Sequence, residues 1–275
     1  MLNDVTLLVK AFERPDSVVA LYKSLRLYYP SIPIVIVDDG NNKPPQDIFD
    51  ENVKYINAEY NIGVSAGRNL ALSHITTEYF VLLDDDFIFT EHTKLENMLE
   101  VLETTDIDIV SGIMHDFGKI KRSFAGCFDV TDDVFTLRIE KTCGESGGYS
   151  LYNIVLNFFM ARTEKIKKIK WDPELKTGEH KEFFIRARAY GIKCTVLESV
   201  TINHFPEQLG NYAEYRSAAA GYEALAFEKH GIHEEIIIEP LSFSKVGREI
   251  KTFFKKSSFL VAFVHFLKKK MKCYQ

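Results

Sequence analysis

The chain has 275 residues, of which 46% are hydrophobic and 27% are charged, and this composition predicts a soluble globular protein with one large or two modest domains. Its net charge of −5 is unevenly placed: the residues from 245 onward hold nine basic side chains and one acid, whereas the first 244 hold 25 basic and 38 acidic side chains. A mildly acidic body excludes general nucleic-acid binding, and the basic tail indicates a partner of its own.

Strands and helices are predicted to alternate through the first 115 residues. Apolar runs predict strands at Val5–Phe12, Ile34–Val37, Val53–Asn57, Tyr79–Asp84 and Ile107–Met114, and helical periodicity predicts helices at Pro15–Tyr29, Ser65–His74 and Glu91–Glu103. The alternation implies a mostly parallel sheet with right-handed crossovers. Neither a Walker loop nor a GxGxxG fingerprint is present, so the usual phosphate-cradling loops are excluded.

The second half is predicted to be less regular. The expected elements are antiparallel hairpins at 119–141, a glycine-rich mobile loop at 143–150, strands at Tyr152–Ala161 and Cys194–Ile202, and helices at Glu179–Tyr190 and Tyr212–His230. No domain boundary is evident before about residue 240.

Three aspartates interrupt the apolar run that extends from Tyr79 to Phe89. Adjacent carboxylates repel one another, and their burial is costly unless a positive charge lies beside them. In an extended backbone Asp84 and Asp86 share a face, so both can approach one divalent cation while Asp85 points elsewhere. Open sheets place ligands beyond the carboxyl ends of their strands, which favours a metal site over the alternative of a solvated acidic turn.

The four cysteines show no CxxC pair and no zinc-site spacing. We expect unpaired thiols in a reducing compartment, with a bridge between Cys127 and Cys143 as the alternative. The N-terminal residues lack the basic and apolar regions of a signal peptide.

Three segments carry a resemblance to a known family. They are AGRNLALSHITTEYFVLLDDDFIFT, LNFFMARTEKIKKIKWDPEL and EHKEFF. In order and spacing they resemble family 2-like glycosyltransferases of the GT-A fold, and in particular the catalytic domain of the β-1,4-N-acetylgalactosaminyltransferases that build GM2/GD2-type gangliosides. The resemblance covers roughly residues 5–215. It implies a nucleotide-sugar enzyme with an α/β, Rossmann-like, mostly parallel sheet, helices on its faces and a small antiparallel part.

The resemblance also assigns a nucleotide-sugar site. Asp38 or Asp39, at the end of the second strand, would accept a hydrogen bond from the uracil or hold the ribose. Arg14 and Arg68 would lie near the diphosphate, because a guanidinium offers phosphate a bidentate set of donors. Asp85 belongs to the same site. The alternatives are a solvated acidic turn and surface ion pairs.

The same resemblance assigns the metal. Asp84 and Asp86 would hold Mn²⁺ or Mg²⁺, which would neutralise the leaving UDP. His204 corresponds to a third protein ligand, and its imidazole favours Mn²⁺ over Mg²⁺.

The EHKEFF segment corresponds in place to the helix start that supplies the base in inverting enzymes of this fold. A sugar hydroxyl needs a carboxylate or an imidazole within hydrogen-bond reach. We expect Glu182 to be this base, with Glu179 and His180 as the other candidates; ordinary acids at a helix start are the alternative reading. Trp171 and the glycine-rich residues 144–148 are expected to line the acceptor side and to close over the donor.

The tail, residues 241–275, interleaves bulky apolar side chains with lysines. Its longest apolar run, Phe259–Leu267, is shorter than the roughly 20 residues that a bilayer-spanning helix requires. We expect an amphipathic helix on an anionic membrane surface, with a helix packed on its own domain or on a partner chain as the alternative. The expected location is therefore the cytoplasmic face of a membrane.

These observations predict a glycosyltransferase domain at 1–240 and a membrane-associating tail at 241–275. The enzyme would move a sugar, GalNAc first and Gal or GlcNAc next, from a UDP-sugar to a hydroxyl of a glycan or glycolipid acceptor with inversion. A sugar nucleotidyltransferase is the alternative enzyme, but the segment VKAFERPDS after the first strand lacks the glycine-rich loop it requires. A non-catalytic, membrane-docked glycan-binding protein is the other alternative, although every expected acid is present.

Overall fold

The computed structural model describes residues 2–122, 124–206 and 219–240. The chain divides into two compact units, Met1–Ile238 and Glu239–Gln275. The predicted tail helix and the first part of the helix predicted at Tyr212–His230 lie outside the described residues.

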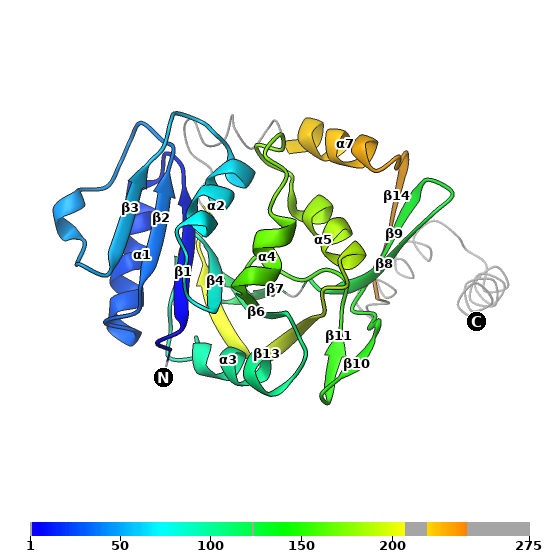
Figure 1. Cartoon of the computed structure of the whole chain (residues 1–275), viewed down its shortest axis with the longest axis horizontal. Helices are drawn as coiled ribbons and strands as arrows, with labels where there is room; N and C mark the ends of the chain where they lie inside the picture. The colour runs from blue at the N-terminus through cyan, green and yellow to red at the C-terminus, as the bar shows by residue number, and fades with distance from the viewer. Residues whose placement is uncertain (1, 123, 207–218, 241–275) are drawn as a thin grey trace, which may run out of the picture. The chain divides into compact units, whose positions relative to one another are not determined.

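The core of the first unit is a nine-stranded sheet with helices on its faces (Figure 1). The strands are β1 (Val5–Ala11), β2 (Ile34–Asp38), β3 (Val53–Asn57), β4 (Tyr79–Asp84), β5 (Phe87–Ile88), β6 (Ile109–Asp116), β7 (Ile120–Arg122), β12 (Phe159–Arg162) and β13 (Cys194–His204). The helices are α1 (Pro15–Tyr28), α2 (Val64–Ser73), α3 (Leu95–Thr104), α4 (Thr163–Ile169), α5 (His180–Ala189) and α7 (Ala219–Lys229), with a 3₁₀ turn at Gln46–Ile48.

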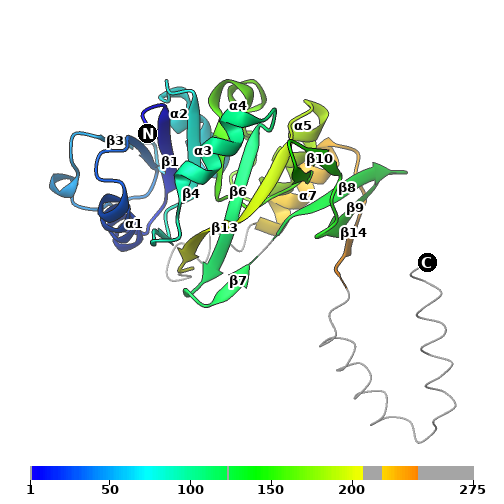
Figure 2. The same cartoon turned by 90° about the horizontal axis from the view of Figure 1, so that it is seen from below.

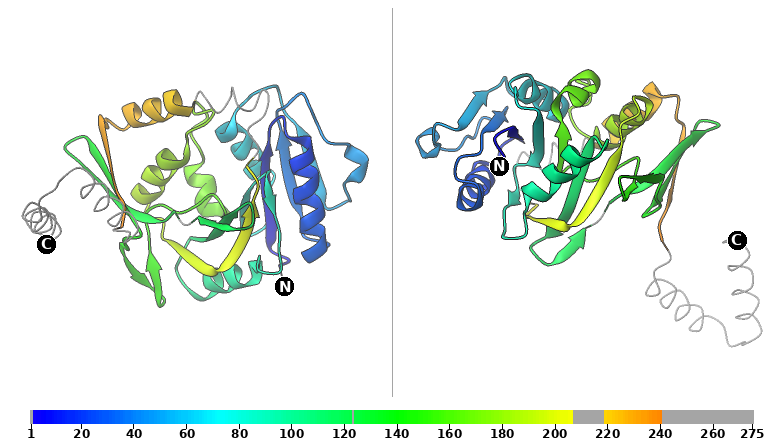
Figure 3. Two further views of the ribbon diagram at one scale, coloured as in Figure 1. Left: turned by 180° about the vertical axis from the view of Figure 1, so that it is seen from behind. Right: turned by 60° about the horizontal axis from the view of Figure 1, so that its bottom comes forward.

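The strand order is β3-β2-β1-β4-β12-β6-β13-β5, with β7 paired to β6. The pairs β3-β2, β2-β1, β1-β4 and β6-β13 are parallel, whereas β12 runs antiparallel to both of its neighbours. The register of β13 on β6 shifts between Val196 and Thr201, and β13, the yellow strand in Figure 3, bends along its length. The predicted mostly parallel α/β sheet is therefore confirmed.

Side chains alternate along each strand between the two faces of the sheet. On β1, Leu7 and Val9 pack in one buried cluster with apolar residues of α1 and α3, whereas Leu8 packs in a second cluster with residues of α2, α4 and α5. Figure 2 shows these helices on both sides of the strands. Successive side chains of a strand point to opposite faces, so a strand covered on both sides must be apolar throughout. All seven residues of β1 are buried, as this rule requires.

Two smaller sheets complete the described unit. β8 (Gly126–Thr131) and β9 (Val134–Ile139) form an antiparallel hairpin, as predicted, and β14 (Glu234–Ile238) pairs in parallel with β9. The glycine-rich segment predicted as a loop instead forms the hairpin of β10 (Gly144–Ser146) and β11 (Tyr149–Leu151). The two glycines of its turn, Gly147 and Gly148, have positive φ angles, a conformation that glycine adopts without a steric penalty.

The structure corrects two of the predicted elements. The helix predicted from Glu91 begins at Leu95, because a turn formed by Thr90 and Thr93 precedes it. The strand predicted at Tyr152–Ala161 is reduced to β12, since its first residues make only isolated bridges to Gly126 and Cys194. Helix α4 and strand β14 were not predicted.

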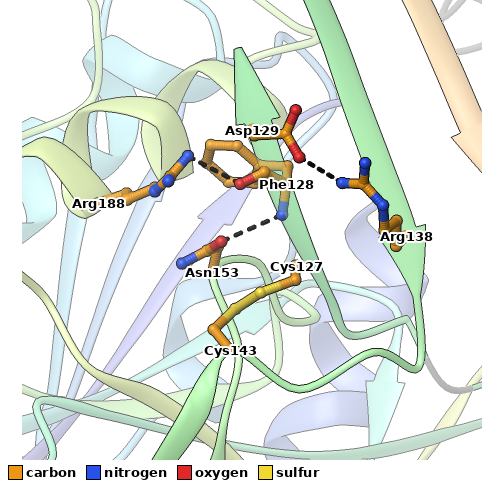
Figure 4. The surroundings of a disulfide bond; sticks show 7 residues. All are labelled: Cys127, Phe128, Asp129, Arg138, Cys143, Asn153 and Arg188. Carbon is orange, nitrogen blue, oxygen red and sulfur yellow. Dashed lines mark hydrogen bonds and ion pairs between the residues drawn. A yellow bond between two sulfur atoms is a disulfide. The ribbon is translucent and has the colours of Figure 1, made fainter. Parts of the chain in front are cut away.

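Cys127 and Cys143 form a disulfide, which corrects the expectation of unpaired thiols (Figure 4). Their Cα atoms are 5.6 Å apart. The N–H of Cys143 donates to the carbonyl of Leu151 and extends the β10-β11 hairpin. The side chain of Asn153 accepts from the N–H of Phe128 and holds this hairpin beside β8. Such a juxtaposition depends on folding and cannot be inferred from cysteine spacing. Cys194 is a buried free thiol, as expected.

Within 2–122, 124–206 and 219–240, no helix combines the length and apolar character needed to cross a bilayer.

Candidate active site

Four strands end in polar side chains at one edge of the main sheet. Asp38, Asp84, Asp116 and His204 are the last residues of β2, β4, β6 and β13. These strands run in the same direction, so their carboxyl ends meet at one edge, where open α/β sheets bind ligands.

The two aspartates that follow β4, Asp85 and Asp86, form ion pairs with one arginine. Nη1 of Arg14 lies 2.6 Å from Oδ2 of Asp86, and its Nη2 contacts Oδ1 of Asp85. The backbone N–H of Phe12 lies 3.4 Å from the other oxygen of Asp85. Burial raises the pKa of Asp85 to about 7, although the charge of Arg14 opposes this shift. Asp85 therefore points toward Arg14, and both it and Asp86 are buried.

Asp86 also approaches the imidazole of His204. Nε2 of His204 lies 3.4 Å from Oδ2 of Asp86, and Nδ1 lies 2.6 Å from Oδ1 of Asp116. Burial alone would lower the pKa of His204, but hydrogen bonding to Asp86 and the charge of that carboxylate raise it. Conversely, burial would raise the pKa of Asp86, but the hydrogen bond from His204 and the charge of Arg14 lower it.

Helix α2 contributes Arg68, which joins two acids from distant parts of the chain. Its Nη2 lies 3.0 Å from Oδ1 of Asp84, and its Nη1 lies 2.6 Å from Oε1 of Glu179, the residue before α5. The Asp84 side chain is 35% exposed, whereas Arg68 and Glu179 are nearly inaccessible. Burial raises the pKa of Asp84, although the charge of Arg68 opposes this shift.

The two acids after β2 are buried and already hydrogen-bonded. The Tyr55 hydroxyl donates to Oδ2 of Asp38 at 2.5 Å, and Gly40 N–H donates to its Oδ1. Asp39 forms an ion pair with Lys10 at 2.5 Å and accepts from the N–H of Gly63. Both carboxylates therefore lie at the predicted edge, and each is held by neighbouring strands or loops.

Lys10 was not predicted. Burial lowers its pKa, although the charge of Asp39 opposes this shift. A Cβ atom at position 67 would lie 2.7 Å from Cγ of Lys10, so Gly67 on α2 leaves room for this side chain.

The three candidate bases have different surroundings. Glu179 joins the strand-end acids through Arg68, whereas Glu182 accepts from Arg186 at 2.5 and 2.8 Å and lies 3.2 Å from Nε2 of His230. His180 lies 2.8 Å from the side-chain oxygen of Asn157, and burial lowers its pKa to about 4.

Trp171, which was expected on the acceptor side, is instead a core residue. Its side chain is 2% exposed and stacks on Phe183 with ring centroids 4.9 Å apart. The guanidinium carbon of Arg68 lies 5.7 Å from the Trp171 ring, so the indole supports the site from within the core.

The carboxylates and the imidazole at this site are groups that bind divalent cations. Oδ1 of Asp86 is buried and has no hydrogen-bond partner in the described part of the chain. The contact of His204 with Asp116 is the carboxylate–histidine arrangement that orients a metal-binding imidazole. Nevertheless, among the described residues no three His, Cys, Asp or Glu side chains are grouped as a ready metal site, because Arg14 and Arg68 hold the carboxylates.

Comparisons with known proteins agree with this fold. The model of the family "Glycosyl transferase family 2" matches residues 6–188, so the chain belongs to this family of glycosyltransferases. It is 37% identical over 187 residues to beta-1,4 N-acetylgalactosaminyltransferase 2 of Mus musculus, covering 66% of this chain and 36% of the relative. It is 36% identical over 189 residues to beta-1,4 N-acetylgalactosaminyltransferase 1 of Rattus norvegicus, covering 66% of this chain and 35% of that protein. The chain thus spans about a third of these curated relatives.

The fold also matches a solved structure. The crystal structure of S. aureus TarS 1–349 in complex with UDP-GlcNAc superposes with a TM-score of 0.55 at 17% identity, covering 81% of this chain and 69% of that chain. The predicted GT-A-like fold and the resemblance to the N-acetylgalactosaminyltransferases are therefore confirmed. The roles assigned to individual residues stay predictions.

Asp116 is a further site residue that sequence reasoning missed. It lies two residues beyond the predicted end of its strand, and the strand in fact continues to it. A search for acids just beyond each apolar run would have found Asp116, whereas Lys10 lies inside such a run and gives no comparable signal.

Proposed function

We propose that this chain transfers a sugar from a UDP-sugar to a hydroxyl of a glycan or glycolipid acceptor, with inversion to a β-linkage. The observation that carries the proposal is the contact of Asp86 with His204 at the edge of the sheet where Asp84 ends β4. GalNAc is the first expected donor sugar, on the strength of the named relatives, and Gal or GlcNAc follow. The complex of TarS with UDP-GlcNAc supports a UDP-sugar as the donor class.

A divalent cation, Mn²⁺ or Mg²⁺, is proposed to bind at Asp84, Asp86 and His204. The unpartnered buried oxygen of Asp86 supports this assignment. The cation would stabilise negative charge on the departing diphosphate. His204, whose Nδ1 contacts Asp116, would supply a nitrogen ligand, and such a ligand favours Mn²⁺.

The remaining polar groups are proposed to bind the nucleotide. Asp38 and Asp39, which are held at the end of β2, would accept a hydrogen bond from the uracil or hold the ribose. Arg14 and Arg68 carry the positive charge that a diphosphate requires. Asp85 maintains the position of Arg14 through their ion pair.

The geometry favours Glu179 over Glu182 as the base. Arg68 joins Glu179 to Asp84, whereas both oxygens of Glu182 face Arg186. A base must reach the hydroxyl that attacks the anomeric carbon, and this carbon lies next to the diphosphate. His180, adjacent to Glu179, remains the second candidate.

The tail is proposed to bind an anionic membrane surface. Its interleaved lysines and bulky apolar residues support this proposal. Removing the residues after Gly247 should release the protein from anionic liposomes without loss of activity on a soluble acceptor. Persistent liposome binding would refute the role of the tail.

The enzymatic proposal is tested by a donor screen that measures UDP release in the presence of an acceptor, with and without Mn²⁺. We expect Mn²⁺-dependent release, greatest with UDP-GalNAc. Absence of release from every UDP-sugar, with a range of glycan acceptors, would contradict the proposal.

A further inference from the structure

Arg14 occupies the position where a cation would be expected at the end of β4. Its side chain is 9% exposed, and the side chains of Asp85 and Asp86 are 2% and 4% exposed. One guanidinium thus pairs with two adjacent carboxylates that are almost fully removed from water. Without it, two buried negative charges would lie side by side, which is strongly unfavourable.

Arg14 contacts one oxygen of the Asp86 carboxylate, and the other oxygen of that carboxylate is the unpartnered one. Oδ2 of Asp86 accepts from Arg14 at 2.6 Å, while Oδ1 has no hydrogen-bond partner in the described residues. A divalent cation bound at Oδ1 would therefore lie within a few ångströms of the guanidinium. Like charges at such a distance in a buried site repel each other, so the two cations compete for Asp86.

The position of Arg14 in the fold allows it to change partners. It is the residue before α1, and the helix begins with Pro15. The backbone is fixed there, whereas the arginine side chain has several rotatable bonds. A guanidinium binds carboxylate and phosphate with the same bidentate geometry, so a diphosphate can replace the two carboxylates as its partner.

We propose that Arg14 is an exchangeable internal counter-ion. It holds Asp85 and Asp86 when the site is empty, and it transfers to the diphosphate of the donor when a divalent cation takes its place at Asp86. This inference rests on the proposed donor and cation. It assigns Arg14 two opposite effects: it weakens binding of the cation alone and strengthens binding of the nucleotide once the cation is present.

The test measures both effects on the full chain. Mn²⁺ binding without nucleotide is followed by the electron paramagnetic resonance signal of free Mn²⁺, and UDP binding at saturating Mn²⁺ is followed by calorimetry. For Arg14→Gln we expect Mn²⁺ to bind about tenfold more tightly and UDP about tenfold more weakly, since one charge-assisted contact is removed in each case. A purely structural role for Arg14 would not move the two affinities in opposite directions.

Two further variants complete the design. Arg14→Lys keeps one positive charge but loses the bidentate geometry of the guanidinium. We expect the affinities for Mn²⁺ and UDP to change in the same directions as in Arg14→Gln, but by less. Arg14→Lys also replaces Arg14→Gln if that variant fails to fold. Arg26→Gln is the matched control, because Arg26 lies on α1, about 18 Å from Arg14 along the helix axis, and pairs with Asp50 outside the site. Both affinities should be unchanged in this control.

The outcomes separate the inference from the function on which it rests. Opposite shifts in the two affinities support the exchange. If the unaltered chain binds Mn²⁺ and Arg14→Gln binds it no more tightly, the exchange is overturned while the cation site stands. If neither protein binds Mn²⁺ with or without UDP, the cation site and the exchange are both overturned.

Discussion

Nη1 of Arg68 lies 2.6 Å from Oε1 of Glu179, which ties the residue before α5 to helix α2. The same guanidinium reaches Asp84, so a candidate base and a candidate metal ligand share one arginine. Glu182, one helical turn further on, pairs with Arg186 instead. The two glutamates therefore have separable roles.

This difference predicts opposite behaviour of two matched variants. Glu179→Gln should lower turnover by about 100-fold or more, the range for loss of a general base, while leaving UDP affinity nearly unchanged. Glu182→Gln should lower the free energy of unfolding by about 1–3 kcal/mol through its weakened contact with Arg186, with turnover of the folded enzyme within a few-fold of the original. Steady-state kinetics and urea unfolding of both variants check this. The reverse pattern would restore Glu182 as the base.

His180 predicts a dependence of stability on pH. Burial lowers its pKa to about 4, from an ordinary value of 6.5, so between these values the unfolded chain binds a proton that the folded chain does not. The stability that His180 contributes is therefore present above pH 6.5 and is lost as the pH falls toward 4, by up to about 3 kcal/mol.

Urea unfolding between pH 4 and 7 measures this dependence. His180→Gln should lose less stability over that range than the unaltered chain, whereas the exposed His92→Gln should follow the unaltered chain. If the free energy of unfolding changed with pH equally in His180→Gln and in the unaltered chain, this imidazole would not be held neutral by burial.

The buried pair of Lys10 and Asp39 predicts a coupling energy. Lys10→Met should cost about 3–5 kcal/mol of stability, because it leaves a buried carboxylate without its cation. The double variant Lys10→Met/Asp39→Asn should recover part of this loss, since the amide oxygen of asparagine can still accept from Gly63 N–H. Chemical unfolding of the two single variants and the double variant gives the coupling. Strictly additive losses would mean that the pair does not stabilise the site.

The disulfide predicts a dependence of stability on reductant. The two cysteines are 16 residues apart, and closing a loop of this size stabilises a fold by about 3 kcal/mol. Reduction should therefore lower the melting temperature of the unaltered chain. The variant Cys127→Ser/Cys143→Ser should melt at the lower temperature and should not respond to reductant. If reductant lowered the melting temperature of both proteins equally, the change would not come from this disulfide.

The positions of the strand-end acids were predictable, whereas their partners were not. Asp38 and Asp84 each end an apolar run, and parallel strands bring such ends together, so local pattern was sufficient. The contact of His204 with Asp116 joins residues 88 positions apart, and that of Arg68 with Glu179 joins residues 111 apart. Such pairings depend on strand order and helix placement, which periodicity does not encode.

The position of Trp171 and the strand β14 could not be predicted for a related reason. Trp171 follows a lysine-rich stretch, which gave no sign that its indole would stack on Phe183 in the core. Likewise, the pairing of β14 with β9 joins strands about 100 residues apart in the sequence. Burial of this kind is a property of the assembled layers.

The central claim is that Asp86 helps to hold a cation that a nucleotide diphosphate requires for binding. It is tested most directly by calorimetric titration of UDP into the full chain, with and without Mn²⁺, and by the same titrations of Asp86→Asn. We predict that UDP binds the unaltered chain tightly only with Mn²⁺, and that Asp86→Asn loses this dependence together with most of the affinity while remaining folded. Equal UDP affinity of both proteins under both conditions would contradict the claim.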